Sequence, residues 1–237
     1  MKVLLIADEE NKVLYEHYDP EKLREVDLIL SAGDLNARYL EFLVTMGHAP
    51  LVYVPGNHDS YYVDHPPMGC DCADDRIIDF RGLRILGLGG SMKYKEGPYL
   101  YTEREMEKRI ERLRRTIMLY NGFDILLTHS PAKGYGDLED LPHQGFQCFN
   151  DLLMRYKPKY MIHGHVHGNY GKFKRVQVHP SGTVIINAFD KYDLNIKKED
   201  HPEEGKTGSL LYDLYKNVSM GRRKYYPQLH GEENDDK

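Results

Sequence analysis

The sequence has only three cysteines, and their number and spacing are typical of a protein kept in a reducing compartment. Cys70 and Cys72 are separated by a single residue, which is too close for an easy disulfide, and Cys148 leaves the total odd. Because nothing else marks the pair at residues 70–72, we interpret it as part of an ordinary loop. We therefore expect no disulfide framework and a cytoplasmic location.

Long hydrophobic runs are also missing. No apolar stretch approaches the roughly 20 residues that a membrane-spanning helix needs. Residues 1–11 contain one lysine and a short apolar run that soon reaches acidic residues, whereas a secretory signal has a longer apolar region and a small-residue cleavage site. This run therefore predicts a first β-strand, and we expect no membrane partner.

Positive charge is not in excess either. The chain has 32 lysines and arginines against 37 aspartates and glutamates, a net charge of −5 and a calculated pI near 6.2. Tight nonspecific nucleic-acid binding requires a basic surface, so nucleic acid is not an expected partner. The length of 237 residues predicts one domain over residues 1–228 and a disordered acidic tail over 229–237.

Strand-like and helix-like segments alternate in the first part of the chain. Apolar runs of the buried-strand type cover residues 2–8, 26–33 and 50–56, and a helical stretch covers 37–47. This order predicts a βαβ arrangement with a largely parallel sheet. Further predicted segments are a loop at 60–75, a hairpin at 76–80 and 83–90, a helix at 102–120 with a Thr102–Glu105 capping box, strands at 123–130 and 160–167, a helix at 145–156, and antiparallel strands at 174–179, 183–189 and 209–215.

Polar residues stand where these predicted strands end. They are Asp8, Asp34, Asn57, His58, Asp59, His129, His165 and His167. Sites in open α/β sheets form beyond the carboxyl ends of the strands, so we expect these residues to share one crevice. Carboxylate, amide oxygen and imidazole together suit Mn²⁺, Fe or Zn²⁺ better than a metal that prefers thiolates.

Each of these residues alone also has an ordinary explanation. A single aspartate at a strand end is more often a turn former or a helix cap than a ligand, and a single histidine is more often a surface residue. In an extended strand residues i and i+2 point to the same side, so His165 and His167 are expected to reach one site together. The same spacing relates His163 to His165, so periodicity alone leaves His163 ambiguous.

The order of these residues resembles that of the calcineurin-like metallophosphoesterases. The family pattern runs D-x-H, G-D, G-N-H-D or G-N-H-E, a lone histidine and G-H-x-H, and the resemblance spans residues 3 to about 190. It implies an α/β fold, a β-sandwich of two mixed sheets flanked by helices, and hydrolysis of a small phosphate-ester substrate with two divalent metal ions, Mn²⁺ first and Fe or Zn²⁺ as alternatives. The matching residues are Asp8, Gly33-Asp34, Gly56-Asn57-His58-Asp59, His129 and Gly164-His165-Val166-His167.

The resemblance also implies a role for each matching residue. Asp34 would bridge the two metals, Asp8 and His167 would hold the first, and Asn57, His129 and His165 would hold the second. His58 would protonate or stabilise the leaving oxygen, with Asp59 orienting it. His163 has no place in the pattern.

A further segment, T-H-S-P followed by H-Q-G-F, resembles a branch of small phosphodiesterase-like members. It implies that His143 lies near the substrate. The alternative is an ordinary loop histidine.

One position departs from the pattern. Glu10 stands where the D-x-H motif has histidine. A carboxylate can replace imidazole as a ligand, and the first metal would then lie in a less positive site with less attraction for a dianionic monoester. The alternative is that Glu10 faces solvent.

Two other functions remain open at this level. The first is a phosphoesterase-like scaffold that binds partners without catalysis, although a scaffold needs no proton donor such as His58. The second is a nuclease of the same superfold, which usually has additional DNA-gripping domains. The sequence leaves monoester and diester substrates, and the oligomeric state, undecided.

Overall fold

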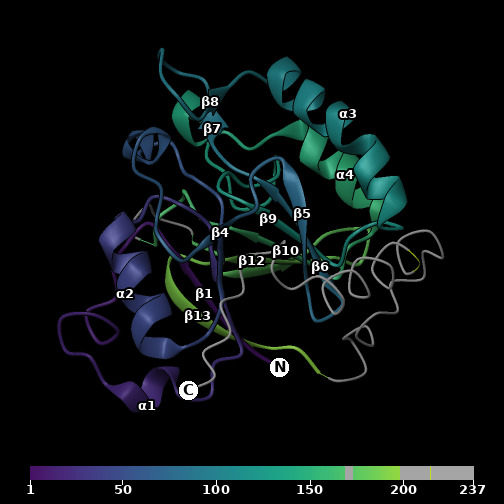
Figure 1. Ribbon diagram of the computed structural model, residues 1–237. Coiled ribbons are helices and arrows are strands. Elements are labelled where there is room, and N and C mark those ends of the chain that lie inside the picture. The colour runs from purple at the N-terminus through teal and green to yellow at the C-terminus, as the bar shows by residue number, and fades with distance from the viewer. Residues whose placement is uncertain (169–172, 198–213, 215–237) are drawn as a thin grey trace.

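Two β-sheets pack face to face, and helices cover their outer faces (Figure 1). A computed structural model describes residues 1–168, 173–197 and 214 of the chain. The first sheet has the order β13-β1-β2-β3-β4, in which β13 is antiparallel to β1 and the other pairs are parallel. Its strands are β1 (Lys2–Ala7), β2 (Leu28–Ser31), β3 (Leu51–Tyr53), β4 (Asp71–Cys72) and β13 (Asp190–Asn195).

The second sheet has the order β11-β12-β10-β9-β6-β5. Its four inner strands run parallel to one another, and the two outer strands, β11 and β5, are antiparallel to their neighbours. The strands are β5 (Arg76–Phe80), β6 (Leu83–Leu88), β9 (Ile125–Thr128), β10 (Tyr160–His163), β11 (Val176–Val178) and β12 (Val184–Asn187). A separate parallel pair joins β7 (Ser91–Met92) to β8 (Leu100–Tyr101).

Each sheet is covered by helices on one side. Helices α1 (Pro20–Leu23) and α2 (Ala37–Gly47) lie against the first sheet, and α3 (Glu103–Leu119) and α4 (Gln147–Tyr156) against the second (Figure 1). Asn36 caps α2 through its side chain, and the predicted Thr102–Glu105 capping box opens α3. Two short 3₁₀ helices, η1 (Ser60–Val63) and η2 (Leu141–His143), occupy loops.

Successive residues of the central strands enter different layers of the core. In β1, Val3 and Leu5 pack between the sheets, whereas Leu4 and Ile6 pack against α2. A strand buried on both faces has no polar side to alternate with, which explains the continuous apolar runs in the sequence. The result is a four-layer arrangement that leaves the carboxyl ends of strands from both sheets close together.

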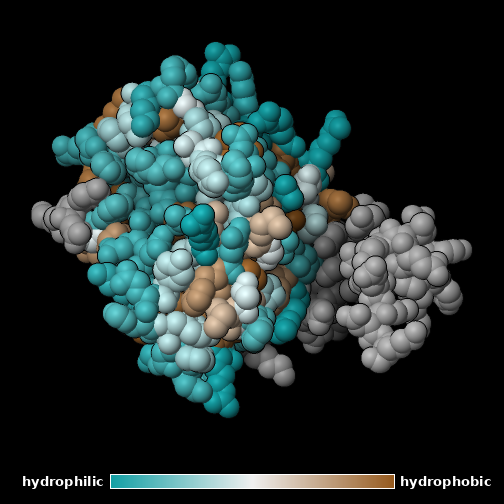
Figure 2. Space-filling view, turned by 60° about the vertical axis from the view of Figure 1, so that its left-hand side comes forward, coloured by the Kyte–Doolittle hydropathy of each residue, from teal (hydrophilic) through white to brown (hydrophobic). Residues whose placement is uncertain are grey.

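The outer surface contrasts with this apolar interior. On the face shown in Figure 2, hydrophilic residues dominate, and hydrophobic residues gather only in small groups between them. Among the described residues, none of the helices is long and apolar enough to cross a membrane.

Most predicted elements are confirmed. The parallel order of β1, β2 and β3 and the bounds of α2 agree with the sequence analysis. So do the hairpin of β5 and β6 and the two mixed sheets flanked by helices.

Several predictions were wrong in detail. The strand predicted to reach His167 ends at His163, and β12 is antiparallel only to β11, because it runs parallel to β10. The loop predicted at 60–75 contains η1 and the short strand β4, while β13 was not predicted. The tail at 229–237 lies outside the described residues, as does the strand predicted at 209–215 except for Leu214, whose backbone is helical.

Candidate metal centre

The predicted site residues meet at the ends of strands from both sheets. Asp8 follows β1, Asp34 follows β2 and Asn57 follows β3 in the first sheet, while His129 follows β9 and His165 follows β10 in the second. Most of them line a cavity of about 420 Å³, and His129 lies fully buried behind it. The lining residues are Asp8, Asp34, Asn57, His58, Tyr94, Pro142, His143, His165 and His167.

The backbone of this site adopts conformations that non-glycine residues rarely take. Asp8, Asp34 and His165 have φ angles of 65°, 57° and 68°. Such strain is retained where the surrounding structure over-determines it, and it gathers at functional sites. A Cβ atom on Gly56 would lie 2.1 Å from Asp34 Oδ1, so only glycine allows this carboxylate its position.

Gly164 explains why β10 stops before the G-H-x-H motif. A Cβ atom on Gly164 would lie 2.6 Å from both Ala7 Cβ and Asp8 Oδ2, so the chain passes close against the end of β1 and then turns. His165 and His167 therefore lie in a turn and not in an extended strand. Both histidines line the same cavity, as expected. They do so because the chain turns after Gly164, and the extended strand predicted for residues 164–167 was wrong.

Three acceptors converge on one nitrogen of His129. Its Nε2 atom lies 3.2 Å from Asp34 Oδ2, 3.0 Å from Asn57 Oδ1 and 3.1 Å from His165 Nδ1. The other ring nitrogen, Nδ1, donates to the carbonyl of Ala32 at 2.7 Å. His165 likewise uses Nε2 as a donor to the carbonyl of Pro142 at 2.7 Å, which leaves a lone pair on its Nδ1.

The charges of this cluster are strongly coupled. Burial alone would lower the pKa of His129, but the charges of Asp34 and Asp8 and the hydrogen bonds to Asp34 and Ala32 together outweigh burial and raise that pKa to about 9. Burial would raise the pKa of Asp34, but the neighbouring His129 charge and hydrogen bonds lower it to about 2. Burial and the His129 charge lower the pKa of His165 to about 3, so its imidazole is neutral. A single proton on His129 thus sits among three acceptors.

This donor set fits a divalent cation. The ligand atoms of Asp34, His129 and His165 lie within 4.8 Å of one another. A cation in place of the His129 proton would satisfy all the converging lone pairs, and each imidazole is already oriented by a hydrogen bond to a backbone carbonyl. One carboxylate, one amide oxygen and two imidazoles are ligands that Mn²⁺, Fe and Zn²⁺ accept.

Asp8 and His167, the other predicted ligands, lie beside this cluster. The side chain of Asp8 is fully buried, accepts the His165 N–H at 2.9 and 3.0 Å, and has Oδ1 3.7 Å from His167 Nε2. Burial raises the pKa of Asp8 to about 7. His167 is half-buried and stacks on Phe189, with ring centroids 5.0 Å apart. Asp8 and His167 line the same cavity as Asp34, as expected for ligands of a neighbouring metal.

His58 and Asp59 are neighbours in the loop after β3, but His58 is exposed and Asp59 is buried. The exposed His58 donates its N–H to Asp34 Oδ1 at 2.7 Å, and its residue lines the cavity. The buried Asp59 carboxylate accepts the N–H groups of Asp34 and Gly56 at 2.8 and 2.7 Å. These contacts join the loops after β2 and β3, so Asp59 orders the site through the backbone.

Glu10, unlike the other predicted ligands, neither lines the cavity nor belongs to the cluster around His129. Its carboxylate accepts a hydrogen bond from the backbone of Asn36 at the start of α2, and burial raises its pKa. The residues lining the cavity do not include it. The role of Glu10 as a metal ligand stays a prediction, and its position outside the cavity does not support that role.

The loop between β9 of the second sheet and α4 contributes Pro142 and His143 to the cavity wall. His143 Nδ1 lies 2.6 Å from Asp140 Oδ2, and its ring lies 5.1 Å from that of His165. His143 thus lines the cavity in which a substrate is expected to bind. His163 does not line this cavity. It is buried, and its Nδ1 atom lies 2.9 Å from the Gly164 carbonyl oxygen. Sequence reasoning missed Tyr94, which also lines it, because no spacing linked this tyrosine to the other motifs.

Comparisons with known proteins identify a family and several relatives of this chain. A sequence model of the family described as calcineurin-like phosphoesterase matches residues 7–169, about two thirds of the chain. The chain is 27% identical over 188 residues to an uncharacterized protein of Haemophilus influenzae, covering 66% of this chain and 80% of that protein. It is 29% identical over 101 residues to the UPF0046 protein T07D4.2 of Caenorhabditis elegans, covering 41% of this chain but only 24% of that protein.

Solved structures share the fold. The protein TT1561 of Thermus thermophilus has a TM-score of 0.55 and 16% identity, with 83% of this chain and 99% of that one covered. Another solved structure has a TM-score of 0.59 and 16% identity, with 85% and 96% covered. The match of the family model to residues 7–169, most of the chain, shows that this chain belongs to the calcineurin-like phosphoesterase family.

Proposed function

We propose that this protein hydrolyses a small phosphate ester with a water molecule activated at a dinuclear centre of divalent metal ions. The observation that carries the proposal is the convergence of Asp34 Oδ2, Asn57 Oδ1 and His165 Nδ1 on His129 Nε2. Family membership supports phosphoester hydrolysis in general. The dinuclear site, the metal, the roles of the residues and a cytoplasmic location belong to the proposal.

Two groups of side chains would hold the metals. Asn57, His129 and His165 would bind one ion, Asp8 and His167 the other, and Asp34 both. Two such ions supply an activated water and positive charge for the phosphoryl oxygens. We expect Mn²⁺, with Fe or Zn²⁺ as alternatives, because the donors mix oxygen with imidazole nitrogen.

The remaining residues would act on the substrate. His58 is exposed, lines the cavity and is tied through its backbone N–H to Asp34, so its imidazole is available to protonate the leaving oxygen. Asp59 would hold the loops after β2 and β3 in register, because its carboxylate accepts an N–H from each. His143, supported by Asp140, would contact the phosphate from the other side of the cavity.

A metal-depletion experiment tests the proposal. The purified protein is treated with a chelator, dialysed, and assayed on p-nitrophenyl phosphate and bis-p-nitrophenyl phosphate with Mn²⁺, Zn²⁺, Fe²⁺ or Mg²⁺ added back. We expect activity to disappear with the metal and return with a transition metal. Asp34→Asn, which removes the shared ligand, should lower both metal content and turnover by at least about tenfold. A binding scaffold would show metal uptake without turnover of either ester.

A further inference from the structure

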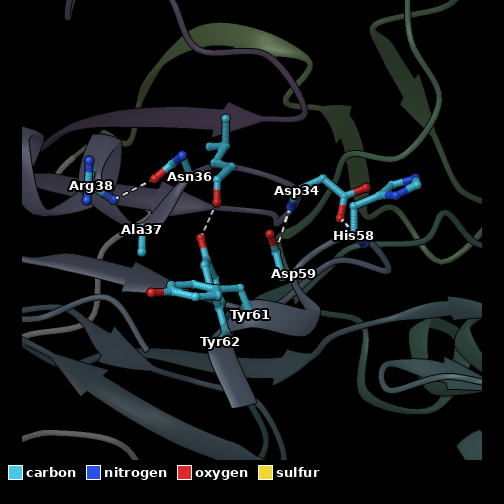
Figure 3. A pocket seen from close by; sticks show the side chains of 9 residues that line it. Asp34, Asn36, Ala37, Arg38, His58, Asp59, Tyr61 and Tyr62 are labelled. Carbon is cyan, nitrogen blue, oxygen red and sulfur yellow. Dashed lines mark hydrogen bonds between the residues drawn. The ribbon is translucent and has the colours of Figure 1, made fainter. Parts of the chain in front are cut away.

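A second cavity opens directly beside the metal centre. Its volume is about 500 Å³, and His58 and Asp34 line both this cavity and the one at the metal centre. The other lining residues, drawn in Figure 3, come from the start of α2 and from η1: Leu35, Asn36, Ala37, Arg38, Asp59, Tyr61 and Tyr62. The two cavities therefore lie next to each other, with Asp34 and His58 forming part of the wall of each.

The chemistry of this second cavity changes along its length. Figure 3 shows His58 and Arg38 at opposite ends of the labelled group, with Ala37, Tyr61 and Tyr62 between them. Tyr61 is 63% exposed, and one face of its ring stacks on His65 with centroids 4.4 Å apart. The Tyr62 hydroxyl donates to the Leu35 carbonyl, which fixes that wall. The cavity thus has an aromatic middle between a catalytic histidine and a cation.

Arg38 differs from the buried arginines of this protein. Arg84 and Arg109 are paired with Asp124 and with Asp74 and Asp75. Within the described part of the chain, the side chain of the exposed Arg38 makes no ion pair and no hydrogen bond, and its backbone N–H donates to Asn36 Oδ1. An arginine that lines a cavity without a carboxylate beside it is a ready partner for an anionic ligand.

We propose that this second cavity binds the leaving group of the substrate and that Arg38 contacts an anionic group at its far end. The inference rests on the proposed function, because the reacting phosphate would lie at the metal centre. His58 would then stand between the phosphorus and the leaving group, where a proton donor for the leaving oxygen is needed. The substrate class is a phosphate ester whose leaving group has an aromatic or apolar body and ends in a carboxylate or a phosphate.

Matched substrates test this assignment. The phosphate esters of 4-hydroxyphenylacetate and of 4-hydroxyphenylacetamide have leaving groups of similar shape and acidity, and they differ by one negative charge far from the phosphorus. Each is assayed as monoester and as methyl diester on the metal-loaded protein. We expect the carboxylate ester to have a KM at least about tenfold lower, the usual worth of one charged hydrogen bond, with similar kcat.

Substitution of Arg38 supplies the second arm. Arg38→Met should abolish the KM difference, chiefly by raising the KM of the carboxylate ester, and Arg38→Lys should retain part of the difference. Arg104→Met is the matched control, because Arg104 is exposed at the corresponding second position of α3, away from both cavities. This control should keep the difference.

The outcomes separate the two proposals. Turnover of the esters with equal KM values, or a KM difference that persists in Arg38→Met, overturns the assignment of the second cavity and leaves the proposed function intact. Absence of metal-dependent turnover for all four esters overturns the proposed function and this inference with it. Free 4-hydroxyphenylacetate should also inhibit competitively, and only when Arg38 is present.

Discussion

His58 is the residue whose substitution best separates the proposed catalysis from metal binding. It lies between the two cavities and is held to Asp34 only through its backbone N–H. Its imidazole can therefore be removed without taking a ligand from the metal centre. The effect of a substitution at His58 on kcat should depend on the leaving group, and this dependence tests whether His58 donates a proton.

We expect His58→Ala to keep its metal content and to lose about 10²–10⁴ in kcat for alkyl esters, the usual contribution of a positioned proton donor. The loss should be smaller for nitrophenyl esters, since nitrophenolate leaves without a proton. Steady-state kinetics over leaving groups of different pKa measure this trend, with the exposed His17→Ala as control. A loss of equal size for every leaving group would instead indicate a role in substrate binding.

Glu10 is the residue at which the family pattern and the contacts disagree. Because its carboxylate faces the backbone of Asn36, we expect Glu10→Ala to retain both metals and near-normal turnover. The cost in unfolding free energy should be about 1 kcal/mol or less, as for a single partly exposed hydrogen bond. Metal analysis checks this directly. Loss of one metal with retention of the other would restore the ligand role that the motif predicts.

At the scale of the elements, Asp34 after β2 and His129 after β9 form a site at which a proton and the proposed metal ion would compete. The His129 pKa of about 9 lies above its ordinary value of 6.5, because the charges of Asp34 and Asp8 and the hydrogen bonds to Asp34 and Ala32 together outweigh burial. In the metal-free protein this proton stabilises the fold fully below pH 6.5, and the contribution is lost as pH rises through 9. A metal ion must displace the same proton.

Metal affinity should therefore rise with pH between 6.5 and 9, by up to about tenfold per unit. Asp8, with a pKa of about 7, adds to this trend at the lower end of the range. Competition with a chelator of known affinity at a series of pH values across this range measures the dependence, and calorimetry in two buffers counts the released protons. An affinity that stays constant over this range would contradict the coupling of Asp34 and His129.

The loops after β2 and β3 are joined by one buried carboxylate. Asp59→Ala leaves the N–H groups of Asp34 and Gly56 without their acceptor, so we expect a loss of about 2–4 kcal/mol in unfolding free energy. Activity should fall with it, because Asp34 depends on this loop. Urea unfolding measures the free energy of unfolding of this variant, with Asp64→Ala, a substitution at an exposed aspartate, as the control. Equal stability of the two variants would show that Asp59 has no such role.

Sequence patterns predicted the elements that are buried on both faces and missed those at the edges. The runs that became β1, β2 and β3 are continuously apolar, whereas β13 at the edge of the first sheet contains only one buried residue, Leu194. The turn after β10 was missed for a different reason. It depends on the close approach of Gly164 to the end of β1, a contact between segments that lie far apart in the sequence.

At the scale of the whole molecule, the metal centre exists because two sheets present their strand ends to one place. The order of the motifs predicted this convergence, and the cavity brings Asp8, Asp34, Asn57, His165 and His167 together with His129 behind them. Motifs could not predict the second cavity, because Arg38 and Tyr61 belong to α2 and η1 and become neighbours only through the packing of these elements. The proposed recognition of the leaving group therefore depends on the fold and not on a sequence motif.

The number of metals needed for turnover tests the central claim most directly. Metal-depleted protein is titrated with Mn²⁺ or Zn²⁺ while bound metal and hydrolysis of bis-p-nitrophenyl phosphate are measured on the same samples. The dinuclear account predicts that activity rises mainly as the second equivalent binds and reaches its plateau at two metals per chain. Full activity at one metal per chain, or in protein without metal, would contradict it.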